Sequence, residues 1–228
     1  MKQIMIFLFA LSMTAVACSQ KSGGEAMKHK DNGIVAIDQY IKGKPYDKFA
    51  VATFAGGCFW CTEASFERIQ GVKDVISGYS GGQEQYPTYQ EVGSGMTHHA
   101  EAIQIFYDPK EVTFQKLLEV FFVAHDPTQL NRQGPDKGPQ YRSAVFFHNE
   151  EQQQATEAYI KKLDESGKFS DPIVTEVSPY TEFWVAEDYH QDYYEQHPEN
   201  PYIRNISTPK VHKVEKTFSD ILKPKYKM

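Results

Sequence analysis

Cysteine is scarce in this chain of 228 residues, which contains only three. So small a number excludes a scaffold held together by many disulfides. Basic residues are also in deficit, with 24 Lys and Arg against 30 Asp and Glu and a net charge of −6. An acidic chain lacks the electrostatic attraction that non-specific nucleic-acid binding requires. We therefore expect no nucleic-acid partner, and the positions of Cys18, Cys58 and Cys61 become informative.

A long hydrophobic run is also missing, although the N-terminus has the three-part pattern of an export signal. Lys2 precedes an apolar run over residues 4–11, and Ala15 and Ala17 lead to Cys18. The run is shorter than the roughly 20 residues that a membrane-spanning helix needs. The pattern resembles a bacterial lipoprotein signal, whose cysteine becomes the acylated first residue of the mature protein. The alternative is a plain signal cut near Ala17, with Cys18 incidental.

An unpaired thiol would be a liability in an oxidising compartment, which favours lipidation of Cys18. We expect residues 1–17 to be a lipoprotein signal peptide and residues 18–44 to be the lipidated N-terminus and a flexible tether. The polar, Gly-rich composition of residues 19–33 supports this interpretation. The prediction is an exported cell-envelope lipoprotein, held at a membrane by its N-terminal lipid.

Residues 45–210 contain no internal repeat or low-complexity block, so they predict one domain, followed by a C-terminal tail over residues 211–228. Hydrophobic periodicity predicts strands over residues 48–54, 72–79, 100–107, 143–148 and 173–177, and helices after Phe59, from Phe114 and over residues 150–168. The main order, strand–helix–strand–strand–helix–strand, is the split βαβ arrangement. The expected fold is an α+β, ferredoxin-like two-layer sandwich with a mixed sheet. A helical turn within residues 184–194 and a helical face in the tail, formed by Val214, Phe218 and Leu222, complete the prediction.

The segment Gly56-Gly57-Cys58-Phe59-Trp60-Cys61 joins the first expected strand to the first expected helix. Two glycines permit a tight turn and the close approach of another molecule. A cysteine at a helix start faces free N–H groups and the positive end of the helix dipole, which favour the nucleophilic thiolate. Cys61 lies about one turn further on, within reach of a disulfide. Zinc binding and a structural disulfide remain alternatives to a redox pair.

The chain resembles A-type peptide methionine sulfoxide reductases in an ordered set of motifs across residues 50–210. The resemblance begins with Gly-Cys-Phe-Trp-Cys-x-Glu at residues 57–63, and further motifs follow in the family's order. They are residues 78–82, 87–89, 95–101, 107–109, 125–127, 132–136, 140–143 and 186–191. The first motif alone is moderately specific, whereas the ordered set is highly specific.

The resemblance implies a role for each residue of the site. Cys58 is the nucleophile that attacks the sulfoxide sulfur and becomes a sulfenic acid, and Glu101 is the general acid. An acid of this kind needs an apolar site that raises its pKa. Further roles fall on Tyr89 and Tyr141 as hydrogen-bond donors to the sulfoxide oxygen, on Asp136 near the substrate amide, and on Phe59 and Trp60 as walls for the S-methyl group.

One departure from the familiar family pattern concerns the second cysteine. Many members have Gly at the position of Cys61 and carry resolving cysteines in a C-terminal tail after an Asn-Pro segment. Here Asn200-Pro201-Tyr202 is present, but no cysteine follows Cys61. Cys61 is therefore expected to be the resolving residue, which forms a disulfide with Cys58. Glu63 is expected to be a charge at the helix start rather than a catalytic group.

The resemblance also implies the substrates and partners. The substrate is methionine S-sulfoxide, free or in proteins, and an external thioredoxin-like dithiol resets the enzyme. No bound cofactor or metal is expected, and the protein is expected to be a monomer. Three rival hypotheses remain: a thioredoxin-like disulfide oxidoreductase, a partner-binding lipoprotein with a structural disulfide, and a cysteine hydrolase that pairs His99 with Cys58.

Overall fold

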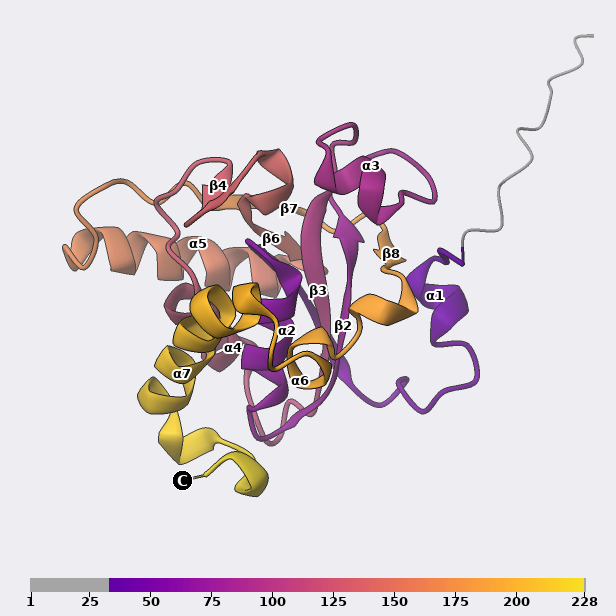
Figure 1. Ribbon diagram of the computed structural model, residues 1–228. Coiled ribbons are helices and arrows are strands. Elements are labelled where there is room, and N and C mark those ends of the chain that lie inside the picture. The colour runs from indigo at the N-terminus through magenta and orange to yellow at the C-terminus, as the bar shows by residue number, and fades with distance from the viewer. Residues whose placement is uncertain (1–32, 228) are drawn as a thin grey trace, which may run out of the picture. The chain divides into compact units, whose positions relative to one another are not determined.

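The computed structural model describes residues 33–227 (Figure 1). The helices are α1 Ile37–Tyr40, α2 Phe59–Glu67, α3 Tyr89–Gly93, α4 Phe114–Ala124, α5 Glu150–Glu165, α6 Tyr193–Gln196 and α7 Thr208–Thr217. The strands are β1 Ala50–Gly56, β2 Val72–Ser80, β3 Ala100–Tyr107, β4 Arg132–Gln133, β5 Asp136–Lys137, β6 Ser143–Phe147, β7 Glu176–Pro179 and β8 Phe183–Val185. Single 3-10 turns cover Pro139–Tyr141, Asp188–His190, Ser219–Ile221 and Pro224–Tyr226, and a π-helical turn covers Ile203–Ser207.

The main sheet has the strand order β7-β6-β1-β3-β2-β8. Strands β1 and β2 both pair antiparallel with β3, so they run parallel to each other with β3 inserted between them. Helix α2 joins β1 to β2, and α4 lies on the path from β3 to β6, which pairs antiparallel with β1. The only parallel pairing in the described sheet is that of β6 with β7. The expected α+β fold with a split βαβ core and a mixed sheet is confirmed.

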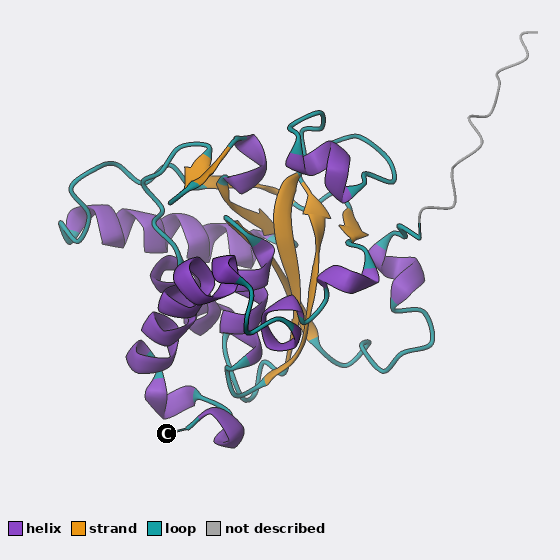
Figure 2. Ribbon diagram, viewed as in Figure 1, coloured by secondary structure: helices purple, strands orange, loops and turns teal. Residues whose placement is uncertain are grey.

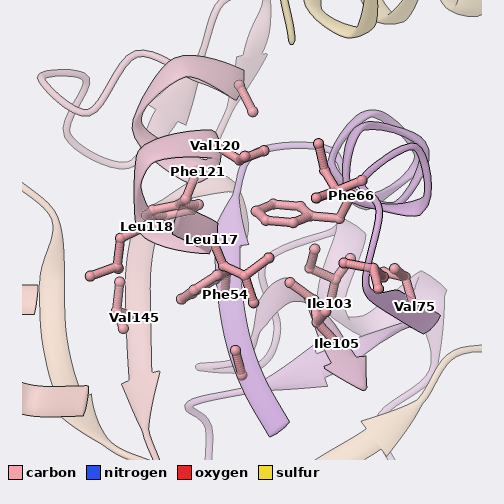
Figure 3. Packing of buried hydrophobic residues seen from close by; sticks show 14 of the residues in the cluster. Phe54, Phe66, Val75, Ile103, Ile105, Leu117, Leu118, Val120, Phe121 and Val145 are labelled. Atoms are coloured by element: carbon pink, nitrogen blue, oxygen red, sulfur yellow. The ribbon is translucent and has the colours of Figure 1, made fainter. Parts of the chain in front are cut away.

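Helices and sheet form two layers (Figure 2). Phe54 of β1 packs against Phe66 of α2 and Phe121 of α4, with the rings of Phe54 and Phe121 4.8 Å apart (Figure 3). Successive side chains of a strand point to opposite faces of the sheet. Ala55, the residue after Phe54 in β1, therefore belongs to a second apolar cluster on the other face. The two faces of the sheet are therefore both covered.

The far face is covered by a segment that was expected to belong to the tether of residues 18–44. Ile37 is buried in the far-face cluster, with Val35, Tyr40 and Ile41 packed against it, whereas Ile34 is buried in the cluster on the helical face. Val35 accepts a backbone hydrogen bond from Val185 of β8 at 2.9 Å. Helix α1 lies on the opposite side of the sheet from α4 and α7 (Figure 1). Apolar side chains in residues 34–41 explain this packing, since the sheet face offers them burial.

The C-terminal tail completes the helical layer. Val214, Phe218 and Leu222 are buried in the same core as α2 and α4, which confirms the apolar face expected for this segment. Arg68 of α2 forms ion pairs with Glu195 at 2.9 Å and with Glu215 of α7 at 2.7 Å. The tail is thus a fixed part of the domain.

Two expected elements differ from the structure. The short strand expected over residues 173–177 is β7, which begins at Glu176, where the pairing with Ala144 of β6 begins. The segment over residues 184–194 contains the expected helical turn, at Asp188–His190, but it starts within β8, because Phe183–Val185 pairs with the edge of β2. A 3-10 turn and α6 follow only after β8 ends. Within residues 33–227, no helix has the length and apolar character needed to cross a membrane.

Candidate active site

The turn between β1 and α2 presents Cys58 at the start of the helix. Gly57 has a φ of +90°, and a Cβ there would lie 2.6 Å from the side chain of Gln133, so only glycine fits this close approach. Cys58 is the N-cap residue of α2, with an extended ψ of 122°. Its side chain makes no cap hydrogen bond with the helix. The N–H of Phe59 donates to Glu101 and those of Cys61 and Thr62 donate to the Cys58 carbonyl, so these three groups do not face the sulfur as free donors.

Cys58 opens onto a pocket of about 310 Å³ that is built from segments far apart in the sequence. Its lining consists of Cys58, Phe59, Trp60, Tyr89, Glu101, Asp136, Tyr141, Asn200 and Tyr202. The structure therefore brings together every residue that the sequence predicted for the substrate site. The predicted resolving residue, Cys61, is not part of the lining.

Glu101 lies on β3 against the start of α2. Its side chain is 2% exposed and accepts a hydrogen bond from the backbone N–H of Phe59, with 3.1 Å between nitrogen and Oε2. Burial raises the pKa of this carboxyl to about 8, and the negative charge of Asp136 adds to the effect. At neutral pH the carboxyl is mainly protonated, so it can donate a hydrogen bond or a proton into the pocket.

Tyr89 and Tyr141 face this carboxyl from two further elements. Thr88 and Glu91 form a capping box that starts α3 at Tyr89. Gln140 donates to the carbonyl of Gly93 at 2.8 Å and so ties the Pro139–Tyr141 turn to the end of α3. Burial and the charge of Glu101 raise the pKa of both phenols, which therefore remain hydrogen-bond donors at neutral pH.

Aromatic rings form one wall of the pocket. Trp60 stacks on Tyr193, with ring centroids 3.9 Å apart, and its indole N–H donates to Nδ1 of His190 at 3.1 Å. Burial lowers the pKa of His190 to about 4, so its ring is neutral and Nδ1 can accept. Phe59 packs against the same histidine at 5.1 Å. The wall is apolar and rigid, as a site for a methyl thioether group requires.

Cys61 lies one turn along α2 and is buried, with its thiol 3.1 Å from the hydroxyl oxygen of Ser207. Both Cys58 and Cys61 are free thiols. They titrate as a pair. The hydrogen bond from Cys58 is the main cause that lowers the pKa of Cys61 to about 7, whereas burial raises the pKa of Cys58. Burial therefore outweighs, at Cys58, the helix-start effect that the sequence predicted would favour its thiolate.

A family model described as peptide methionine sulfoxide reductase matches residues 50–222. The chain belongs to the peptide methionine sulfoxide reductase family. It is an enzyme that reduces methionine sulfoxide.

Individual relatives agree with this assignment. The reductase is 52% identical to peptide methionine sulfoxide reductase MsrA 1 of Rhodopirellula baltica over 80% of its own length and 93% of the relative's. It is 48% identical to the MsrA of Thermus thermophilus over 76% of its length and 98% of the relative's. Reduced Mxr1 of Saccharomyces cerevisiae is a solved structure with a TM-score of 0.62 and 36% identity, covering 67% of this chain and 88% of that one. The solved structure of methionine sulfoxide reductase A of Corynebacterium diphtheriae has a TM-score of 0.60 and 36% identity, and the match covers 69% of this chain and 78% of that one.

Two lining residues of the reductase received no role from its sequence. Tyr202 donates a hydrogen bond to the carboxylate of Asp136, and Asn200 donates to the hydroxyl of Tyr193 at 3.1 Å. The signal in the sequence is the Asn200-Pro201-Tyr202 segment, which matches the family pattern but by itself indicates no contact with the pocket. Tyr202 closes the pocket opposite Trp60, with ring centroids 5.9 Å apart.

The expectation for Glu63 was wrong. It is the fifth residue of α2, its side chain is 1% exposed, and burial raises its pKa well above the usual range, so it is not a charge at the helix start. The pairing of His99 with Cys58 has no support, because the ring of His99 accepts from the N–H of Gly82 and contacts the carbonyl of Glu84 at 2.8 Å. Cys18 lies outside the described residues. Among residues 33–227, no three His, Cys, Asp or Glu side chains are placed to hold a metal ion.

Proposed function

We propose that the reductase acts on the S epimer of methionine sulfoxide, free or in proteins, through attack of Cys58 on the sulfoxide sulfur. The observation that carries this proposal is the shared pocket of Cys58 and Glu101, in which a nucleophilic sulfur and a neutral carboxyl face the same space. Sulfur is a soft nucleophile suited to a sulfur centre, and a proton donor must accompany it because oxygen leaves a sulfoxide only when protonated.

The first step transfers the oxygen from substrate to enzyme. Glu101, Tyr89 and Tyr141 donate hydrogen bonds to the sulfoxide oxygen and so make the substrate sulfur more electrophilic. The Cys58 sulfur bonds to that sulfur, and the oxygen then moves to Cys58 as the thioether departs. The products are methionine and the sulfenic acid of Cys58, so the enzyme sulfur is oxidised by two electrons and the substrate is reduced by two.

The remaining lining residues bind the substrate. Phe59 and Trp60 give the S-methyl group an apolar wall. The tilted contact of Phe59 with His190 and the stacking of Trp60 on Tyr193 fix their positions. Asp136 accepts from the hydroxyl of Tyr202, which keeps its carboxylate oriented toward the pocket, where a backbone N–H of a peptide substrate can donate to it. The proposed working unit is a monomer.

The second step regenerates the thiol of Cys58. The Cys61 sulfur attacks the sulfenic sulfur of Cys58, a disulfide forms, and the oxygen leaves as water. An external dithiol of the thioredoxin-like class then reduces the disulfide and is itself oxidised to a disulfide. Cys61 supports this role by its position one turn from Cys58 on the same helix, and no cysteine follows it in the sequence.

The cellular setting is part of the same proposal. The signal-like residues 1–17 and Cys18 support an exported lipoprotein that repairs oxidised proteins of the cell envelope. Metabolic labelling with an alkyne fatty acid tests this: the full chain should be labelled, and Cys18→Ala should remain unlabelled. Labelling that persists in Cys18→Ala, or its absence from both proteins, would contradict the anchor.

The activity is tested with a peptide that contains one methionine sulfoxide of known configuration. Mass spectrometry should show the loss of one oxygen from the S epimer and no change in the R epimer when dithiothreitol is supplied. Reduction of both epimers at similar rates would overturn the stereochemical part of the proposal. Rapid reduction of a disulfide protein such as insulin, without loss of oxygen from the peptide, would instead favour a general disulfide oxidoreductase.

A further inference from the structure

Lys210 is a half-buried lysine with an enclosed Nζ atom, and none of the roles above uses it. It lies on α7, and its Nζ atom is enclosed and has no hydrogen-bond partner. An enclosed ammonium without a partner is costly, because it has lost its hydration and gained nothing in return. A compensating negative charge nearby would remove this cost, so the surroundings of Lys210 indicate what it does.

The charge of Lys210 acts on two titratable neighbours, Cys61 and His125. Both ring nitrogens of His125 are engaged, with the carbonyl of Phe121 and the hydroxyl of Ser143, each at 2.7 Å. Burial lowers the pKa of His125 to about 4, and a neutral imidazole gives the ammonium no anion. Of these two neighbours, only Cys61 can become an anion, and Asp136 also acts on this thiol.

The helix that carries Lys210 also provides a second group for Cys61. Ser207 precedes α7, yet its side chain makes no cap hydrogen bond with that helix and lies 3.1 Å from the Cys61 sulfur instead. Ser207 and Lys210 are three residues apart, so they lie on the same side of the helix. The π-helical turn Ile203–Ser207 leads into this contact, and such turns are frequent at functional sites.

We propose that Lys210, together with the hydroxyl of Ser207, holds Cys61 as the thiolate of the Cys58–Cys61 pair. Lys210 is then a positioning residue, which acts through Cys61 and touches no substrate. This inference rests on the proposed resolving role of Cys61 and adds the group that makes Cys61 reactive.

A thiolate at Cys61 serves both disulfide steps. In resolution, the Cys61 thiolate bonds to the sulfur of the Cys58 sulfenic acid, the S–O bond breaks, and the departing hydroxide takes up a proton to become water. In reduction, a thiolate of the external dithiol attacks Cys58, the sulfur that lines the pocket, and Cys61 leaves as a thiolate. The second thiol of the dithiol then displaces Cys58 from the mixed disulfide. A leaving thiol of low pKa departs faster.

Several other groups act on the same thiolate. The hydrogen bond from Cys58 favours the thiolate most, burial opposes it, and Lys210 and Ser207 favour it, which together lower the pKa of Cys61 to about 7. The charged or titratable groups that face the pair are Cys58, Glu101, Asp136, Tyr202 and Lys210. Of these, only Lys210 is a cation. Its removal should therefore raise the pKa of Cys61, whereas removal of Asp136 should lower it.

The decisive experiment titrates the reduced protein and needs no substrate. The ultraviolet absorbance of the thiolate is followed against pH for the wild type, Lys210→Met and Lys216→Met, the last being an exposed cation of the same helix. We expect Lys210→Met to raise the first thiol midpoint by at least about one pH unit, and Lys216→Met to leave it in place. Lys210→Arg keeps the positive charge, so its thiol midpoint should stay close to that of the wild type. An unchanged midpoint in Lys210→Met overturns the proposal.

A further variant identifies which sulfur is titrated. In Cys61→Ser, the thiolate that forms near neutral pH should disappear, leaving only the high-pKa thiol of Cys58. A low-pKa thiolate that persists in this variant would place the charge on Cys58 and would also overturn the proposal. Circular dichroism of each variant establishes that the fold is intact.

Single-turnover kinetics provide a readout that a purely structural role would not change. With methionine sulfoxide in excess, Lys210→Met should release the first methionine at the wild-type rate but form its disulfide severalfold more slowly near neutral pH. The difference should vanish at alkaline pH, where Cys61 ionises without help. If Lys210→Met slows disulfide formation by the same factor at every pH, the proposal is contradicted. If the wild type forms no Cys58–Cys61 disulfide, the resolving role itself fails, while the titration still decides whether Lys210 controls Cys61.

Discussion

Helix α2 has a pocket end, formed by Cys58 and Phe59, and an enclosed body that includes Cys61 and Glu63. A buried carboxyl accompanies each region: Glu101 faces the pocket end, and Glu63 lies within the body. Both are almost fully buried, at 2% and 1% exposure, and in both burial raises the pKa. Only Glu101 shares a cavity with the nucleophile. The comparison teaches that a raised pKa does not identify a catalytic acid, whereas its position beside the reacting sulfur does.

The largest effect should follow removal of the nucleophile from the pocket end. Cys58→Ser should reduce no methionine sulfoxide, even in a single turnover, because a serine oxygen is a poor nucleophile toward sulfur. Quantifying methionine released per chain by mass spectrometry checks this. Release of one methionine per chain by Cys58→Ser would show that Cys58 is not the nucleophile.

The matched change in the enclosed body should stop the cycle later. Cys61→Ser should release about one methionine per chain and then stall as the Cys58 sulfenic acid, because no other cysteine of residues 33–227 can resolve it. A sulfenic-acid probe such as dimedone should label the stalled protein at Cys58. Continued turnover with a protein dithiol as reductant would show that Cys61 is not the resolving residue.

The next effect concerns the carboxyl at the pocket end. Glu101→Gln should slow methionine formation about 10²- to 10⁴-fold, the range over which general acids contribute. The wild-type rate of this step should fall as pH rises through about 8, since the protonated carboxyl is the active form and is lost above its pKa. The pH dependence should be absent from the variant. Full activity of Glu101→Gln at every pH would remove Glu101 from the acid role.

The smallest effect on activity should come from the carboxyl of the enclosed body. Glu63→Gln should remain within about twofold of the wild-type rate, because Glu63 lines no part of the pocket. It should instead change how stability depends on pH. The folded state binds the Glu63 proton more tightly than the unfolded state does, so the wild-type free energy of unfolding falls as pH rises above the ordinary value of 4.5.

Urea unfolding at several pH values checks this last expectation. The glutamine variant should lose less stability than the wild type between mildly acidic and mildly alkaline pH. Glu101 and Glu67 also have raised pKa values, about 8 and about 7, so part of the dependence should remain in Glu63→Gln. Identical curves for the two proteins would show that Glu63 is no more protonated in the folded state than in the unfolded one.

The sequence was sufficient for the central fold because its signals are local. Strand β3 alternates apolar residues over Ala100–Tyr107, and Thr113 caps α4 by accepting from the N–H of Lys116. The strand β8 could not be predicted, because Phe183–Val185 is three residues long and owes its conformation to pairing with β2. The same holds for residues 34–37, whose burial depends on a sheet face that the sequence does not reveal.

Pocket residues could be predicted where they lie in recognisable motifs. Residues that approach the site only through the packing of distant segments could not. Cys58, Glu101 and Tyr141 stand in motifs that the resemblance covers. The burial of Glu63 follows from α2 being enclosed, and no pattern near Glu63 shows this. Ser207 contacts Cys61, and the Nζ atom of Lys210 is enclosed, only because the segment that leads into α7 packs on α2. A lysine on an amphipathic helix otherwise predicts exposure.

The stacking of Trp60 on Tyr193 gives the reductase an internal optical reporter. Trp60 lines the pocket two residues after Cys58. It is one of two tryptophans in the sequence, and the other is Trp184 in β8. Indole emission is quenched by nearby disulfides and is sensitive to changes in ring stacking. The redox state of the site should therefore be visible in the fluorescence of the unlabelled protein, with Trp184 as an internal reference, and each half of the cycle can be timed in a stopped-flow instrument without a coupled assay.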